Sequence, residues 1–144
     1  MSALAIVALV LGILLVLALV LLPIRRRARR TEADVAAELG DGVRRSEQVL
    51  GLGLESRGRG QVRGNGLLAL GEDELVFRML VPRRETRIPL AGVTAVGSER
   101  TWLGKWIGVR LLRVRWRTPE GGEDAMAWRV RDLDAWIAAL GGER

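Results

Sequence analysis

Residues 3–24 constrain this chain more than any other segment. The run carries no charge and no side chain more polar than a glycine or a proline. As a helix at ~1.5 Å per residue it would extend ~33 Å, against a hydrocarbon core of ~30 Å. Inside a bilayer, a single segment satisfies all its backbone N–H and C=O groups only as a helix. The sequence therefore predicts a single-span transmembrane anchor over residues 1–24.

A cleaved signal peptide is the alternative interpretation of this run. Such peptides have a basic n-region, an apolar core of ~7–15 residues and a small-residue cleavage site. Here no lysine or arginine precedes the run, and it ends in LLPIRRRARR where a cleavage site would be expected. The pattern favours an anchor that stays attached.

Five arginines follow the apolar run directly, and they predict its orientation. They are Arg25, Arg26, Arg27, Arg29 and Arg30. Because arginines beside a span are retained on the cytoplasmic side, we expect the N-terminus outside and the C-terminal domain in the cytoplasm. Arg25, Arg26 and Arg27 are also candidate contacts for anionic lipid of the inner leaflet. A nuclear-localisation or nucleic-acid reading of RRRARR is disfavoured beside a span.

The segment 25–52 is predicted to be a basic juxtamembrane region with a short helix and a linker. In TEADVAAEL, Thr31 is a plausible N-cap, and Gly40 is a plausible stop. The mixture of glycine and charge after Gly40 indicates a linker, and we expect the stalk from residue 31 to about 52 to be ordered only in part.

Composition excludes most catalytic chemistry. The chain has no histidine, cysteine or tyrosine, so ordinary zinc sites, thiol chemistry and histidine acid–base catalysis are absent. We therefore expect no enzyme activity, no cofactor and no metal site. The 22 arginines beside a single lysine are typical of a GC-rich bacterial genome, which suggests a bacterial cell membrane.

Beyond residue 52 the apolar pattern changes to the period of two that predicts β-strands. GNGLLALGEDELVFRML indicates a hairpin, and Leu112, Val114 and Trp116 alternate with arginines in the clearest strand. The last segment differs, because RDLDAWIAALGG has the apolar spacing of an amphipathic helix, which we place at 131–140. Residues 53–144 are therefore predicted to be a β domain closed by one helix.

The order of these motifs resembles that of bacterial PH-like (GRAM-related) domains, and more closely that of bacterial proteins with one N-terminal span and such a domain. The resemblance covers roughly residues 50–140 and depends on IPL-x-x-V-x-x-V and W-x-V-x-x-L-x-x-W. It implies a mainly β fold: a PH-like barrel of two packed antiparallel sheets capped by the C-terminal α-helix. PH-like domains bind lipids, peptides or nothing known, so the resemblance implies no activity.

The charged turns have two interpretations. PRRETR places Arg83, Arg84 and Arg87 in or beside one turn, where guanidinium groups could contact lipid phosphate or simply be solvated. The acids of GEDE and the glycines of GRGQVRGNG are better explained as turns, because neither has the spacing of a calcium loop or a P-loop.

TWLGKW is the candidate binding loop. Trp102 and Trp106 bracket Gly104 and Lys105, so alternation alone cannot assign both rings to the core. One ring at least is expected to cover an end of the barrel. The alternative is an exposed loop in which Trp102, Lys105 and Trp106 contact a partner or the membrane interface.

Together these observations predict an integral, single-span membrane protein. Its PH-like module is expected to act as a non-enzymatic binding or scaffolding domain, through a protein partner or self-association. Recognition of anionic lipid by the arginine turns is the alternative. Nucleic acid is an unlikely partner, because the arginine face of the strand lacks interleaved aromatics.

Overall fold

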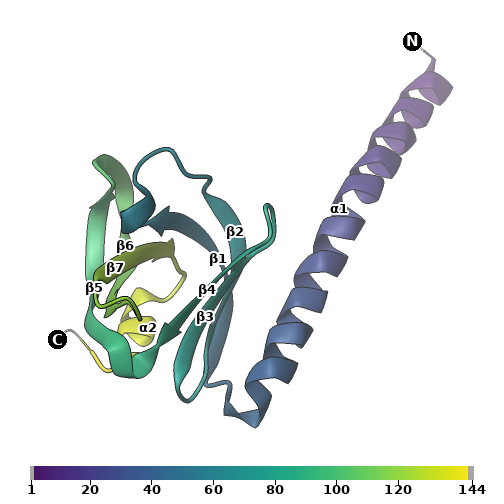
Figure 1. The fold of residues 1–144 in the computed structure, drawn as a ribbon. Helices are drawn as coiled ribbons and strands as arrows, with labels where there is room; N and C mark the ends of the chain where they lie inside the picture. Colours follow the sequence, from purple (N-terminus) through teal and green to yellow (C-terminus); the bar gives the residue numbers. More distant parts are fainter. Residues whose placement is uncertain (1, 143–144) are drawn as a thin grey trace.

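The computed structural model describes residues 2–142 and is mainly β (Figure 1). Its helices are α1 (Ala3–Leu39) and α2 (Leu133–Ala139). Its strands are β1 (Arg45–Leu54), β2 (Gly64–Leu70), β3 (Glu74–Met79), β4 (Arg84–Pro89), β5 (Val93–Trp102), β6 (Lys105–Arg117) and β7 (Glu123–Arg129).

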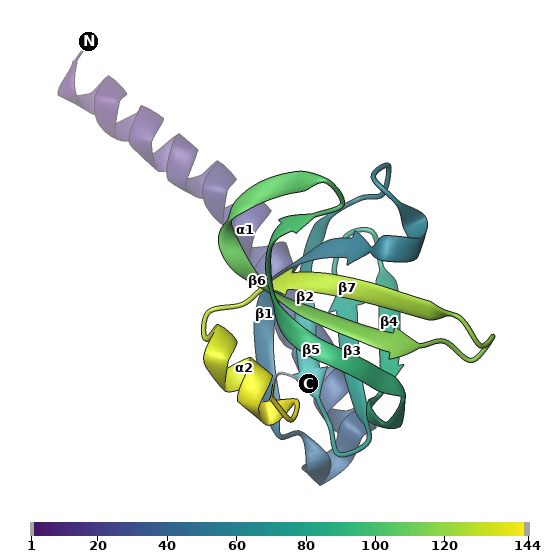
Figure 2. The same cartoon turned by 90° about the vertical axis from the view of Figure 1, so that its left-hand side faces the viewer.

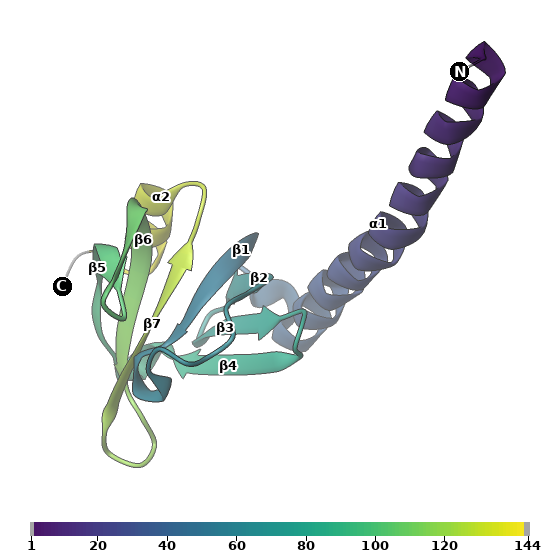
Figure 3. The same cartoon turned by 90° about the horizontal axis from the view of Figure 1, so that it is seen from above.

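The seven strands form one antiparallel sheet rather than the two packed sheets that were expected. Its strand order is β4-β3-β2-β1-β7-β6-β5, so β7 joins the two halves by pairing with both β1 and β6. The register of the β1–β7 pair shifts between Gly51 and Leu54, and such an irregularity bends a strand. The sheet curls into a half-barrel whose halves face each other (Figures 2 and 3).

The inner face of the curled sheet holds the main core, and α2 covers one end of it. Leu112 and Val114 are fully buried there and Trp116 is nearly so, which confirms the predicted alternation of β6. Trp136 anchors α2 in this core, and its Nε1 donates to Glu47 of β1 at 2.8 Å. Asp132 caps the helix by accepting from the backbone N–H of Ala135 at 3.0 Å.

The helix α1 continues far beyond the apolar run. It is long and apolar enough to cross a membrane, with a mean hydropathy of 3.4 over its most apolar window, and this part is exposed. The separate short helix predicted to begin at Thr31 does not exist, because α1 runs uninterrupted to Leu39. Thr31 is instead buried within it and donates to the carbonyl of Arg27 at 3.0 Å. The predicted stop at Gly40 is confirmed: this residue caps α1 with a φ of 65°.

The linker predicted before residue 52 is largely the strand β1, so this prediction was wrong. Two of the glycines that suggested a flexible segment lie where neighbouring side chains leave no room for a Cβ atom. A Cβ on Gly51 would lie 2.5 Å from the Phe77 ring, and one on Gly53 would collide with Gln61. Gln61 holds this stretch further, because its side chain accepts from the N–H of Leu54 and donates to the Leu54 carbonyl.

Candidate functional site: the junction of the anchor helix and the sheet

The last turns of α1 lie on the outer face of β2. Val35 is 1 % exposed and packs with Leu67 and Ala69, while Leu39 covers the edge of this small cluster. Leu67 and Ala69 alternate with Leu68 and Leu70, which point into the main core. Both faces of β2 are therefore buried, one by the curled sheet and one by the helix.

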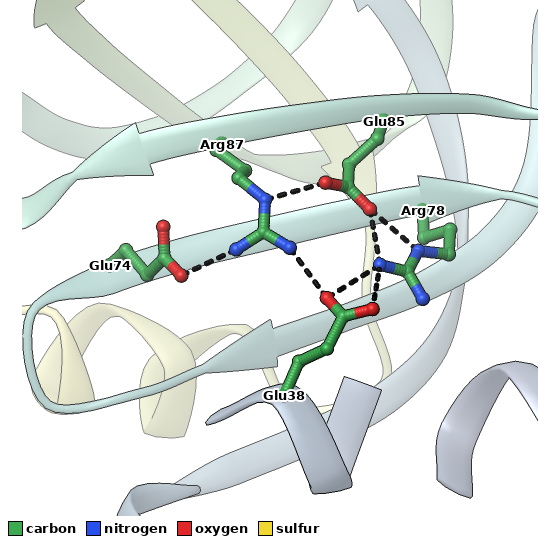
Figure 4. Close-up of polar contacts among 5 residues, drawn as sticks. All are labelled: Glu38, Glu74, Arg78, Glu85 and Arg87. Atoms are coloured by element: carbon green, nitrogen blue, oxygen red, sulfur yellow. Dashed lines mark hydrogen bonds and ion pairs between the residues drawn. The ribbon is translucent and has the colours of Figure 1, made fainter. Parts of the chain in front are cut away.

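Five charged side chains join the same part of α1 to β3 and β4 (Figure 4). The carboxylate of Glu38, in α1, forms ion pairs with Arg78 at 2.8 Å and with Arg87 at 2.6 Å. Arg78 also pairs with Glu85 at 2.5 Å, and Arg87 pairs with Glu85 at 2.5 Å and with Glu74 at 2.6 Å. We call these five residues the junction cluster. A carboxylate in the last turn of a helix is unfavourable beside the negative end of the helix dipole, and the two guanidinium groups offset this at Glu38.

The ion pairs lower the pKa values of two carboxyl groups in the cluster. Hydrogen bonds from Arg78 and Arg87 hold the pKa of Glu38 below its ordinary value. Desolvation opposes ionisation of Glu85, but the bonds from Arg87 and Arg78 outweigh it and lower the pKa of this carboxyl as well. Glu38 and Glu85 are thus held in their ionised form at neutral pH by the guanidinium groups of Arg78 and Arg87.

The candidate lipid-contact arginines fall into three groups. Arg87 is engaged with three carboxylates in the junction cluster, so it has little capacity for an outside phosphate. Arg84 is exposed on β4, and Arg25 and Arg26 are exposed on α1. Arg27 and Arg83 belong to distant segments, yet they line one cavity of about 450 Å³ between α1 and the β3–β4 turn.

The loop TWLGKW separates its two rings. Trp102 is 5 % exposed, packs on Leu111 from the outer side of the sheet and donates through Nε1 to the Gly53 carbonyl at 3.1 Å. Trp106 is 73 % exposed, and Lys105 beside it is exposed as well. One ring, that of Trp102, is buried, but it lies on the outer face of the sheet and not at an end of the barrel, where one ring was expected. Of the three candidate residues of this loop, Lys105 and Trp106 are accessible to a partner and Trp102 is not.

Sequence reasoning missed a cleft of about 610 Å³ at the point where β7 ends. It is lined by Glu47–Leu50 of β1, by Val109 and Arg110 of β6, and by Arg129–Arg131. On this side β1 has ladder partners only from Leu50 onward, because the chain leaves the sheet after Arg129 to form α2. Exposed strand edges and guanidinium groups together are suited to an extended acidic segment. No local signal shows this cleft, since it depends on where β7 leaves the sheet.

Comparisons with known proteins add little to this geometry. No family model matches the chain, and no curated protein matches it. One solved structure, the C-terminal domain of an unknown protein from Leishmania infantum, aligns with 13 % identity and a TM-score of 0.47. The alignment covers 81 % of this chain and 97 % of that one.

Proposed function

We propose that this chain is a single-pass membrane protein whose PH-like β domain is a non-enzymatic binding or scaffolding module at the cytoplasmic face of a bacterial membrane. The observation that carries the proposal is the continuity of α1. Its apolar part is exposed, as a lipid-facing helix would be, and its last turns are buried on the sheet. The β domain would therefore be held beside the membrane by a stiff helix instead of a flexible tether.

The PH-like part of the proposal is supported by a curled antiparallel sheet with a C-terminal helix packed into one end of its core. The binding role is supported by accessible surface that the fold itself does not need. Trp106 is exposed at the β5–β6 hairpin although four other tryptophans are buried. An exposed tryptophan beside a lysine is suited to a protein partner, including a second copy of the chain.

Two measurements on the full-length chain in its native membrane test the proposal. The chain should resist alkaline extraction, and a reporter fused after Arg144 should be active only in its cytoplasmic format. Release into the alkaline supernatant, or activity only in the external format, would contradict the anchoring or the orientation respectively.

The binding role needs a separate experiment. A photocrosslinking residue placed at Trp106 should capture one discrete protein, or a second copy, whereas the same residue at the exposed Arg100 of β5 should not. Equal labelling from both positions would show that the hairpin has no preferred partner and would refute its assignment as the binding loop.

A further inference from the structure

The cavity between α1 and the β3–β4 turn has a composition that the fold does not explain. It is lined by Arg27, Arg30, Thr31, Asp34, Leu80 and Arg83. We propose that it binds the phosphate of an anionic membrane phospholipid, at the point where the anchor leaves the bilayer. This inference rests on the proposed membrane anchoring and adds a ligand class to it.

The three guanidinium groups are available for such a ligand. Within residues 2–142, Arg27, Arg30 and Arg83 form no ion pair, in contrast to Arg78 and Arg87 a short distance away. Guanidinium presents its donors in a planar fork that fits phosphate oxygens. The carboxylate of Asp34 reduces the net charge of the lining to two positive charges, which suits one phosphate group.

Along α1, the cavity begins at the level of the lipid headgroups, at Arg27, and extends beyond them. With a rise of ~1.5 Å per residue, Arg27 lies ~5 Å and Arg30 ~9 Å beyond Ile24, the last residue of the apolar run. The headgroup layer on each side of a bilayer is ~5–8 Å thick. Because Arg83 lines the same cavity, the β3–β4 turn is brought to this level too. Figure 1 shows that turn extending from the sheet toward the middle of α1.

The tip of the β3–β4 turn carries aliphatic side chains, which suit the boundary between lipid headgroups and acyl chains. Val81 is 68 % exposed there, and Leu80 beside it is partly exposed and lines the cavity. Exposed aliphatic side chains at a turn are costly in water, but at the headgroup boundary they can contact the glycerol and upper acyl carbons. A lipid seated between α1 and the turn would thus meet guanidinium groups and apolar groups in one place.

The junction holds the two walls of this cavity in position before any ligand arrives. Val35 is buried on β2 one turn after Thr31, and Glu38 pairs with Arg78 of β3 one turn later. The guanidinium groups from α1 and from the turn therefore need not be brought together by the lipid. Preorganisation of this kind lowers the entropic cost of binding.

The test uses the full-length chain in neutral detergent micelles, titrated with phosphatidylglycerol, phosphatidylcholine or inorganic phosphate, with bound lipid counted by native mass spectrometry. We expect one phosphatidylglycerol to bind in preference to phosphatidylcholine. The double variant Arg30→Gln/Arg83→Gln should raise its apparent Kd at least about tenfold. The matched control is Arg29→Gln/Arg100→Gln, which removes the same charge. At ~100° per residue, Arg29 lies about 150° around α1 from the cavity-lining face.

The outcomes separate a built site from general attraction. Equal weakening by the two double variants, or equal binding of both lipids, would refute the site. Displacement of the lipid by inorganic phosphate at equal concentration would also refute it, since the apolar turn would then contribute nothing. Circular dichroism of both variants verifies that they fold. Alkaline extraction reports on the anchor independently, so a failed anchor is distinguishable from a failed lipid site.

Discussion

Replacing Val35 is the sharpest test of the junction between α1 and the sheet. This side chain is 1 % exposed and lies on Leu67 and Ala69. Burial of a valine contributes ~1.5–3 kcal/mol, and a buried amide without partners would cost ~1–3 kcal/mol more. The total loss for Val35→Asn is limited by the free energy of docking itself, because α1 can detach instead of burying the amide. We therefore expect a loss of ~2–4 kcal/mol.

The matched control is Ala36→Asn, at a neighbouring position on the exposed side of the same helix turn. Valine and asparagine have similar helix propensities, whereas replacing alanine by asparagine costs up to ~0.7 kcal/mol. The control therefore bears the larger propensity penalty, and any excess loss in Val35→Asn must come from the contact with β2.

Urea unfolding of the full-length chain in micelles measures both variants. Intrinsic fluorescence reports on the β domain, because Trp102, Trp116, Trp128 and Trp136 are buried. With a slope of ~2 kcal/mol per molar urea, the midpoint should fall by ~1–2 M for Val35→Asn and by less than ~0.4 M for Ala36→Asn. Equal midpoints for the two variants would refute the docking of α1 on β2.

Three further predictions use the same urea assay. The lowered pKa values of Glu38 and Glu85 stabilise the folded state above the unfolded value of ~4.3, and this contribution is lost as the pH falls through the lowered values. Wild type should therefore lose more stability between pH 5 and 2 than Glu38→Gln/Glu85→Gln; parallel pH profiles would contradict this. Trp102→Ser should cost ~3–5 kcal/mol and Trp106→Ser less than ~0.5 kcal/mol, because only the first ring is buried; similar losses would show that both rings pack. Gly66→Ala should cost at least ~1–3 kcal/mol, since its Cβ would collide with the backbone of β3; an unchanged midpoint would disprove the tight β2–β3 contact.

The strands with one solvent-exposed face were predictable, because the alternation of apolar and polar residues along a strand is a local property of the sequence. In β6, for example, the buried residues are Leu112, Val114 and Trp116. The helix α2 was equally predictable, from the helical spacing of its apolar residues. The strand β1 was missed because tertiary contacts explain its glycines: a Cβ on Gly51 would collide with the Phe77 ring, and a Cβ on Gly53 would collide with Gln61. The burial of Leu67 could have been predicted from the sequence. All four residues of LLAL are apolar, so both faces of this strand are apolar, which indicates that both are covered.

The candidate site was predictable in its parts but not as an assembly. Arg27 and Arg83 were each singled out for their surroundings in sequence, yet only the docking of α1 places them around one cavity. The two tryptophans of the β5–β6 hairpin could not be separated by alternation. Leu103 and Gly104 between them have φ values of 50° and 75°, so the turn interrupts the strand pattern.

The continuity of α1 also determines which face of the span remains free for another helix. At ~100° per residue, Ala8 lies about 180° and Gly12 about 140° around the helix from Val35, which is docked on β2. On an undistorted helix this small-xxx-small pair would face away from the β domain. Packing of two anchors through Ala8 and Gly12 would place the two β domains on the outer sides of the pair, where neither blocks the approach of the helices. A flexible linker would let the β domain rotate relative to the span. The junction at Val35 and Glu38 instead couples the orientation of the β domain to the direction of the span.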